Sequence, residues 1–108
     1  MKNHGEILKN EGMQMSLFNA DKKINGWSAS ARVFLEQYVG RFPEARFQTE
    51  DVRRWAYKRG LENPPSERAW GSVVSSAKKE GLIRFVGYES VENPLAHMTP
   101  AAVWEKVP

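Results

Sequence analysis

Between Thr49 and Tyr88 the hydrophobic spacing changes from a helical period to that of a strand, and this order limits how the chain can fold. Two amphipathic segments come first, TEDVRRWAYKRG and SERAWGSVVSSAKKEG, separated by the turn-forming sequence LENPP. Each segment ends in glycine, a common residue just past a helix end. The segment LIRFVGY follows and is rich in β-branched and aromatic residues, which favours a strand. The sequence therefore predicts two short helices and a strand in direct succession.

A further helix is expected upstream, capped by Ser28 or Ser30 and ended by Pro43. Its apolar residues recur at the spacing of one helix face: Ala31, Phe34, Leu35, Tyr38 and Phe42. Phe47 follows in a short extended piece, and residues 101–104 predict a second strand beside the one at 83–86. These elements predict an α+β fold of three helices and a small antiparallel β wing, with core tryptophans.

The chain of 108 residues suggests one small domain after a flexible tail. Residues 1–26 lack a hydrophobic period and contain glycines and a terminal Asn25-Gly26 turn signal, so we expect the tail at 1–26 and the domain at 27–108. Thr49 is the expected N-cap of the second helix, with Glu50 and Asp51 in its first turn. We assign this acidic pair to the helix dipole and not to acid–base catalysis.

Several classes of activity find no support in the residues. The chain has no cysteine and two separated histidines, His4 and His97, which argues against a metal site. No glycine-rich phosphate loop or paired nucleophile and base is visible, so we expect a non-enzymatic protein without a cofactor. No apolar run approaches the ~20 residues that cross a bilayer, and no secretory signal is visible. We therefore expect a cytoplasmic protein that makes no membrane contact.

Positive charge is concentrated in the predicted helical pair. The net charge is only +3, but residues 46–88 contain nine basic and five acidic side chains. On the second helix of the pair, the face opposite the buried stripe has cations at its ends and small hydroxyls between them, which suits close approach to base edges. The candidate DNA-binding residues are Arg68, Ser72, Ser75 and Lys79 on this face, with Arg53, Arg54 and Lys58 on the preceding helix.

From about residue 28 to 107 the pattern resembles winged helix-turn-helix proteins, and most closely the small ones of bacteriophages and prophages. The resemblance is carried by FQTEDVRRWA (47–56), RAWGSVVSSAKKEGLIRFVGY (68–88) and VWEKV (103–107). It implies that the second helix of the pair enters the DNA major groove. It also implies wing contacts between Glu89 and His97, although that stretch contains acids and no lysine or arginine.

The expected tail contains a second motif. Its residues Gln14, Met15, Ser16, Leu17 and Phe18 resemble the bacterial sliding-clamp-binding pentapeptide, with methionine at the position where leucine is preferred. In a partner's groove the Leu-Phe pair would bury apolar surface. The alternative is that Leu17 and Phe18 fold back onto the domain's own core.

Three functional hypotheses follow. The first is a phage-derived protein that binds double-stranded DNA and is recruited to replication, near the nucleoid, through the sliding clamp. The second is a transcriptional regulator that makes no clamp contact. The third is a protein-interaction module of the replication machinery, because a fold alone does not fix a function. The sequence leaves the oligomeric state open.

Overall fold

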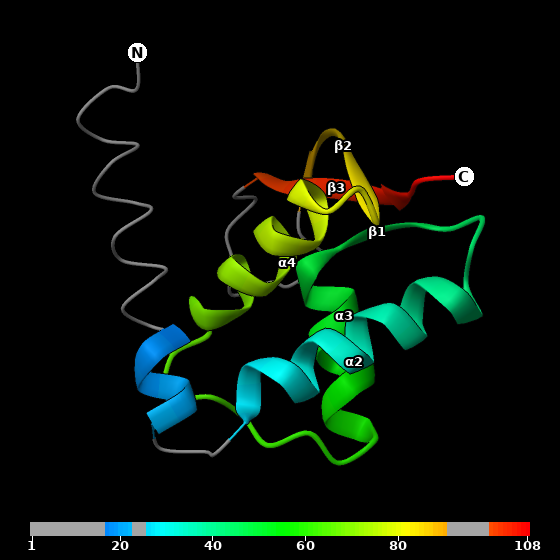
Figure 1. Cartoon of the computed structure of the whole chain (residues 1–108). Helices are drawn as coiled ribbons and strands as arrows, with labels where there is room; N and C mark the ends of the chain where they lie inside the picture. The colour runs from blue at the N-terminus through cyan, green and yellow to red at the C-terminus, as the bar shows by residue number, and fades with distance from the viewer. Residues whose placement is uncertain (1–16, 23–25, 91–99) are drawn as a thin grey trace.

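The computed structural model describes residues 17–22, 26–90 and 100–108 (Figure 1). A helical segment at residues 17–22 precedes the main elements. These are α2 (Trp27–Arg41), β1 (Arg46–Gln48), α3 (Thr49–Lys58), α4 (Ala69–Lys79), β2 (Ile83–Ser90) and β3 (Pro100–Lys106). The described chain is thus a mixed fold of helices and one antiparallel sheet, which confirms the α+β class.

The sheet has three strands in the order β1-β3-β2, with β3 in the centre. The hairpin of β2 and β3 agrees with the strands expected from the sequence, although both are longer. The short extended piece at Phe47 proves to be a third strand, since Phe47 pairs with Trp104 across β1 and β3. This pairing closes the sheet over the helices and places Phe47 in the core, where its exposed fraction is 2%.

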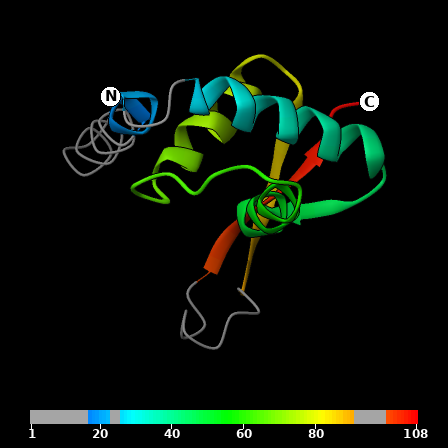
Figure 2. The same ribbon diagram turned by 90° about the horizontal axis from the view of Figure 1, so that it is seen from below.

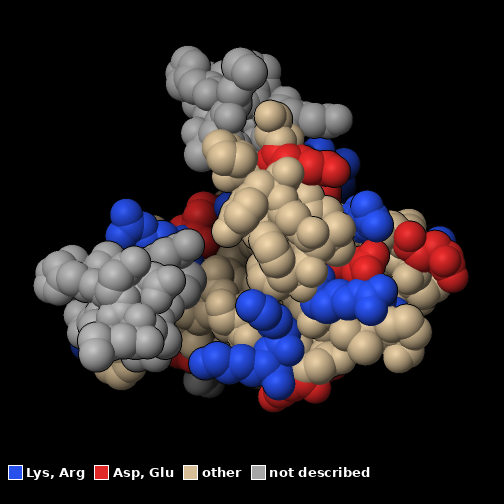
Figure 3. All heavy atoms as spheres, turned by 90° about the horizontal axis from the view of Figure 1, so that it is seen from above, with Lys and Arg blue, Asp and Glu red and all other residues tan. Residues whose placement is uncertain are grey.

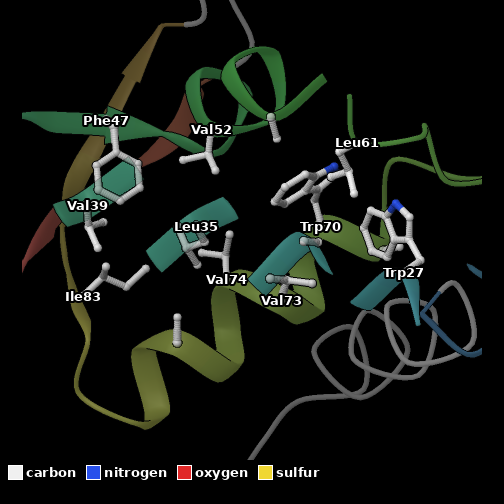
Figure 4. Close-up of a cluster of buried hydrophobic side chains, with 14 of the residues drawn as sticks. Trp27, Leu35, Val39, Phe47, Val52, Leu61, Trp70, Val73, Val74 and Ile83 are labelled. Carbon is white, nitrogen blue, oxygen red and sulfur yellow. The ribbon is translucent and has the colours of Figure 1, made fainter. Parts of the chain in front are cut away.

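The three helices α2, α3 and α4 pack around one hydrophobic core beside the sheet. Figure 2 looks nearly along α3 and shows α2 crossing beside it. In Figure 4, Trp27 and Trp70 lie side by side at one end of the core, while Phe47, Val39 and Ile83 fill the other end. The inner side of α4 is buried as its helical spacing predicts at Ala69, Trp70, Val73 and Ala77, and Val74, expected at the border of this stripe, is buried as well.

Two helix starts differ from the sequence prediction. The helix expected to begin at a capping Ser28 or Ser30 begins at Trp27, after the N-cap residue Gly26. Gly26 has no side chain to act as a cap, and the Asp21 carboxylate takes that role: it accepts bonds from the Ser28 amide and hydroxyl, both 2.8 Å long. Thr49 is the first residue of α3 and not its N-cap. Gln48 is the N-cap, and its backbone N–H donates to the Asp51 carboxylate at 2.8 Å.

Residues 17–22 do not belong to a flexible tail, because they are helical and packed on the domain. Ala20 is fully buried and Leu17 packs against the core cluster. Their burial and the Asp21 cap stabilise this segment, a long-range effect that the local sequence pattern does not show. The described domain therefore begins before residue 27. Residues 1–16, with Gln14, Met15 and Ser16 of the clamp-like motif, lie outside the described chain.

We expect Asp21→Ala to lower the free energy of unfolding by about 1 kcal/mol, the usual contribution of a helix N-cap. The carboxylate satisfies the Ser28 amide at the start of α2 and also ties residues 17–22 to that helix. Urea denaturation monitored by circular dichroism measures the effect. Asn19→Ala, at an exposed position of the same segment, is the control. Equal stability of the two variants would mean that the cap contributes nothing.

Candidate nucleic-acid interface

The outer side of α4 presents cations at both ends of the helix. Arg68 is exposed just before the first turn, and Lys78 and Lys79 are exposed in the last turn. Ser75 lies between them and is partly exposed. Because the opposite side of α4 is buried in the core, the position of this face is fixed by packing. Seen from above, lysine and arginine side chains lie in separate groups around a broad uncharged surface, with acidic groups between some of them (Figure 3).

Ser72 lies at the edge of this face and not at its centre. It lines a shallow hollow between α4, α2 and the helical segment at 17–22, together with Ser76, Ser28 and Leu17. The structure thus brings Arg68, Ser75 and Lys79 together on the outward face, with Ser72 turned toward the neighbouring helices. Lys78 was missed by the sequence reasoning, although an exposed lysine in the last helical turn is common.

The three cations proposed on α3 have different environments. Arg53 is half-buried, and its Nε lies 3.6 Å from the Glu67 carboxylate, one residue from Arg68. Arg54 lies within 3.8 Å of Glu50 and 3.7 Å of Asp51 on its own helix. Lys58 is exposed, and no ion pair joins it to another residue of the described chain. The side chains of α3 therefore do not form one continuous basic surface with α4.

Arg54 also lies on a different side of the molecule from the α4 face. It lines a polar hollow with Arg46, Gln48 and Glu89, between the start of α3 and the sheet. This placement separates Arg54 from Arg68 and Lys79. Of the three α3 cations, Arg53 is the one that the ion pair to Glu67 connects to the beginning of α4.

A hydrogen-bond network holds the start of α4 against α3. The Tyr57 hydroxyl donates to the Glu67 carboxylate at 2.7 Å and accepts a bond of 2.9 Å from the Trp70 indole N–H. Trp70 is fully buried, so its N–H would otherwise have no partner. Burial, and then the bond to Glu67, raise the pKa of the Tyr57 hydroxyl well above its usual value. The neutral hydroxyl is therefore the form that fits this site.

The outer face of the sheet has charges of its own, but these are paired. Glu105 on β3 accepts bonds from Arg84 on β2 at 2.6 Å and from Arg46 on β1 at 3.4 Å. The bond from Arg84 is the main cause that lowers the pKa of this carboxyl. Both arginines are more than half exposed, so the cluster is a solvated ion-pair network. It makes the sheet's outer face a weaker candidate for an anionic ligand than the outward face of α4.

The described chain gives no sign of a metal centre or a membrane span. No group of three or more histidine and acidic side chains lies together among residues 17–22, 26–90 and 100–108. None of the helices in those ranges is both long and apolar enough to cross a bilayer. Residues 91–99, which include His97 and most of the expected wing contacts, lie outside the described ranges.

Neither protein-family models, nor curated proteins, nor solved structures gave a match to this chain. The chain's own residues and geometry therefore carry any inference about its function.

We expect Tyr57→Phe to lower stability at neutral pH by about 1–3 kcal/mol, because it leaves the buried Trp70 N–H without an acceptor. The raised pKa of Tyr57 gives a pH test. The stability that the neutral Tyr57 hydroxyl contributes is complete below the unfolded-state pKa of about 10 and is lost as the pH rises above that value. The stability difference between wild type and variant should therefore shrink above about pH 10. Urea denaturation at several pH values measures it, and a constant difference would contradict the assigned network.

Proposed function

We propose that this chain is a non-enzymatic winged-helix protein of the phage type that binds duplex DNA through α4. The main observation behind this proposal is the outward face of α4, which has cations at both ends and small side chains between them. Two features support the proposal. An antiparallel hairpin directly follows α4, and α3 contacts the beginning of α4 through Tyr57. Both are what the resemblance to winged-helix proteins implies.

The spacing of the cations on α4 suits a duplex. Arg68 and Lys79 are eleven positions apart, which corresponds to about 16 Å along a helix. The major groove of B-DNA is about 12 Å wide. Cations at the two ends of α4 can therefore reach phosphates on opposite sides of the groove, while Ser75 approaches the base edges. Phosphate contacts of this kind supply affinity without strong sequence preference.

We expect the double variant Arg68→Ala/Lys79→Ala to bind random duplex more weakly and with a flatter salt dependence. For each phosphate that the variant no longer neutralises, the slope of log K against log salt should become shallower by about 0.9. The matched control is Arg41→Ala/Arg46→Ala, which removes the same charge from exposed positions on α2 and β1. Fluorescence anisotropy at several salt concentrations measures both.

An equal decrease of affinity in the two double variants would mean that binding follows net charge and that α4 is not the contact surface. Full affinity in both would remove the DNA-binding assignment of this helix.

The second part of the proposal is recruitment to replication by the bacterial sliding clamp, and the two described residues of the motif differ in how well they suit it. Phe18 is 62% exposed and free to enter a partner's groove. Leu17 packs against the core, so its side chain must leave that position before a groove can take it. The segment 17–22 would therefore have to detach for full engagement. An isolated peptide has no such packing to break.

A peptide of residues 10–22 is expected to bind the clamp with a dissociation constant of roughly 1 μM, about −8 kcal/mol. Phe18→Ala should abolish binding of both peptide and protein, and should leave the melting temperature unchanged because the ring is exposed. Leu17→Ala should also abolish binding, but with a lower melting temperature. Isothermal titration and thermal melting measure these effects. A Phe18→Ala protein that still binds the clamp would contradict the recruitment proposal.

The contact of Leu17 with the core favours one alternative, a DNA-binding regulator that makes no clamp contact. In that case Leu17 serves only to hold residues 17–22 on the domain. Duplex binding without clamp binding would select this alternative.

A further inference from the structure

Two large aromatic side chains on β2 are exposed to solvent. Phe85 is 42% exposed and Tyr88 is 70% exposed. Their ring centroids lie 5.1 Å apart, and the Phe85 ring lies 5.9 Å from the ring of Trp104 on β3. Trp104 packs against the core. The three rings therefore form a row that begins at the core and ends in solvent at Tyr88.

A bulge in β2 places the two exposed rings on one face of the sheet. Phe85 pairs with Trp104, and Gly87 pairs with Val103, the adjacent residue of β3. Val86 therefore has no partner on β3 and is the extra residue of the bulge. In a regular strand, side chains three positions apart point to opposite faces. The bulge shifts the alternation by one, so Tyr88 shares the face of Phe85 and Trp104. Bulges commonly redirect a side chain in this way near functional surfaces.

The residues paired with this part of β2 leave the Tyr88 ring uncovered. Ala102 lies opposite Tyr88, and Pro100 lies opposite Ser90. Neither side chain is large enough to cover a tyrosine ring. In Figure 3 a broad uncharged surface lies over β2, the uppermost strand of Figure 1, with lysine and arginine groups beside it and an acidic group at one edge.

The charges around the aromatic row favour an anionic partner. Lys78 and Lys79 are exposed at the end of α4, directly before the turn into β2, and Lys106 lies opposite Ile83 on the face of Phe85. The acids nearby in the described chain point elsewhere or are paired. Glu89 and Glu105 alternate to the other face, and Glu80 forms an ion pair with Arg32.

We propose that Phe85 and Tyr88 form a stacking platform for the unpaired bases of a DNA strand, so that the preferred substrate is a duplex with a single-stranded extension. This inference rests on the proposed function, since α4 would hold the duplex part. The flat face of a base stacks on an aromatic ring, and that face is free only when the base is unpaired. Two rings are too few for a stable protein interface, which takes about 20–30 residues a side.

The test compares three labelled DNAs by fluorescence anisotropy: a blunt duplex, the same duplex with a tail of about six thymidines, and one with an abasic tail of equal length. The abasic tail keeps the phosphates and removes the bases. The wild-type protein should bind the thymidine tail about tenfold more tightly than the abasic tail, as stacking of one base implies. Tyr88→Leu should erase this difference and leave blunt-duplex affinity unchanged, whereas Tyr88→Phe should keep it.

Equal affinity for the two tails, or a difference that survives Tyr88→Leu, would overturn the platform even if the blunt duplex binds well. No binding of the blunt duplex would overturn the proposed function instead, and the single-stranded thymidine and abasic oligonucleotides would then test the platform alone. Sedimentation of wild type and Tyr88→Leu completes the set. A wild-type dimer that Tyr88→Leu converts to monomer would show that the rings bind a second copy, which also overturns the inference.

Discussion

The position of α4 depends on its Trp70 side chain, which packs against both α2 and α3. Its ring makes an edge-to-face contact with Trp27 of α2, with centroids 5.5 Å apart, and a second with Tyr57 of α3 at 6.3 Å. The indole N–H donates to the Tyr57 hydroxyl, while the Trp27 N–H donates to the Glu62 carbonyl in the turn between α3 and α4. The two packed rings thus fix both ends of this connection: Trp70 holds the start of α4, and Trp27 holds the turn that leads into it. Because these contacts hold the inner face of α4, they also fix the direction of its outward face.

The sequence predicted the parts of this fold that depend on local periodicity. The buried stripe of α4 follows from helical spacing, and the end of α3 shortly before Gly60, whose φ is +101°, follows from the backbone freedom of glycine. Distant contacts were not visible. The pairing of β1 with β3 joins residues such as Arg46 and Glu105, and the cap of α2 comes from Asp21. No pattern within a few residues encodes such contacts.

The candidate site was predictable to the same degree. Arg68, Ser75 and Lys79 share one face because helical geometry puts them there, and the structure agrees. Ser72 lies at the edge of that face, where it lines a hollow with α2 and Leu17, and helical spacing does not reveal these neighbours. The exposed pair of Phe85 and Tyr88 was missed for a related reason: their spacing of three places them on opposite faces unless a bulge intervenes.

Contact between the outward face of α4 and DNA can be measured residue by residue, by amide chemical-shift mapping of the ¹⁵N-labelled protein. The chain is 12.3 kDa, a convenient size for the measurement. Titration with a random duplex should shift amides from Arg68 to Lys79 and the adjacent part of β2, and leave those of β1 and the exposed side of α2 unchanged. Shifts confined to the sheet's outer face around Arg46 and Arg84, or no shifts at saturating duplex, would mean that α4 is not the DNA-contacting helix.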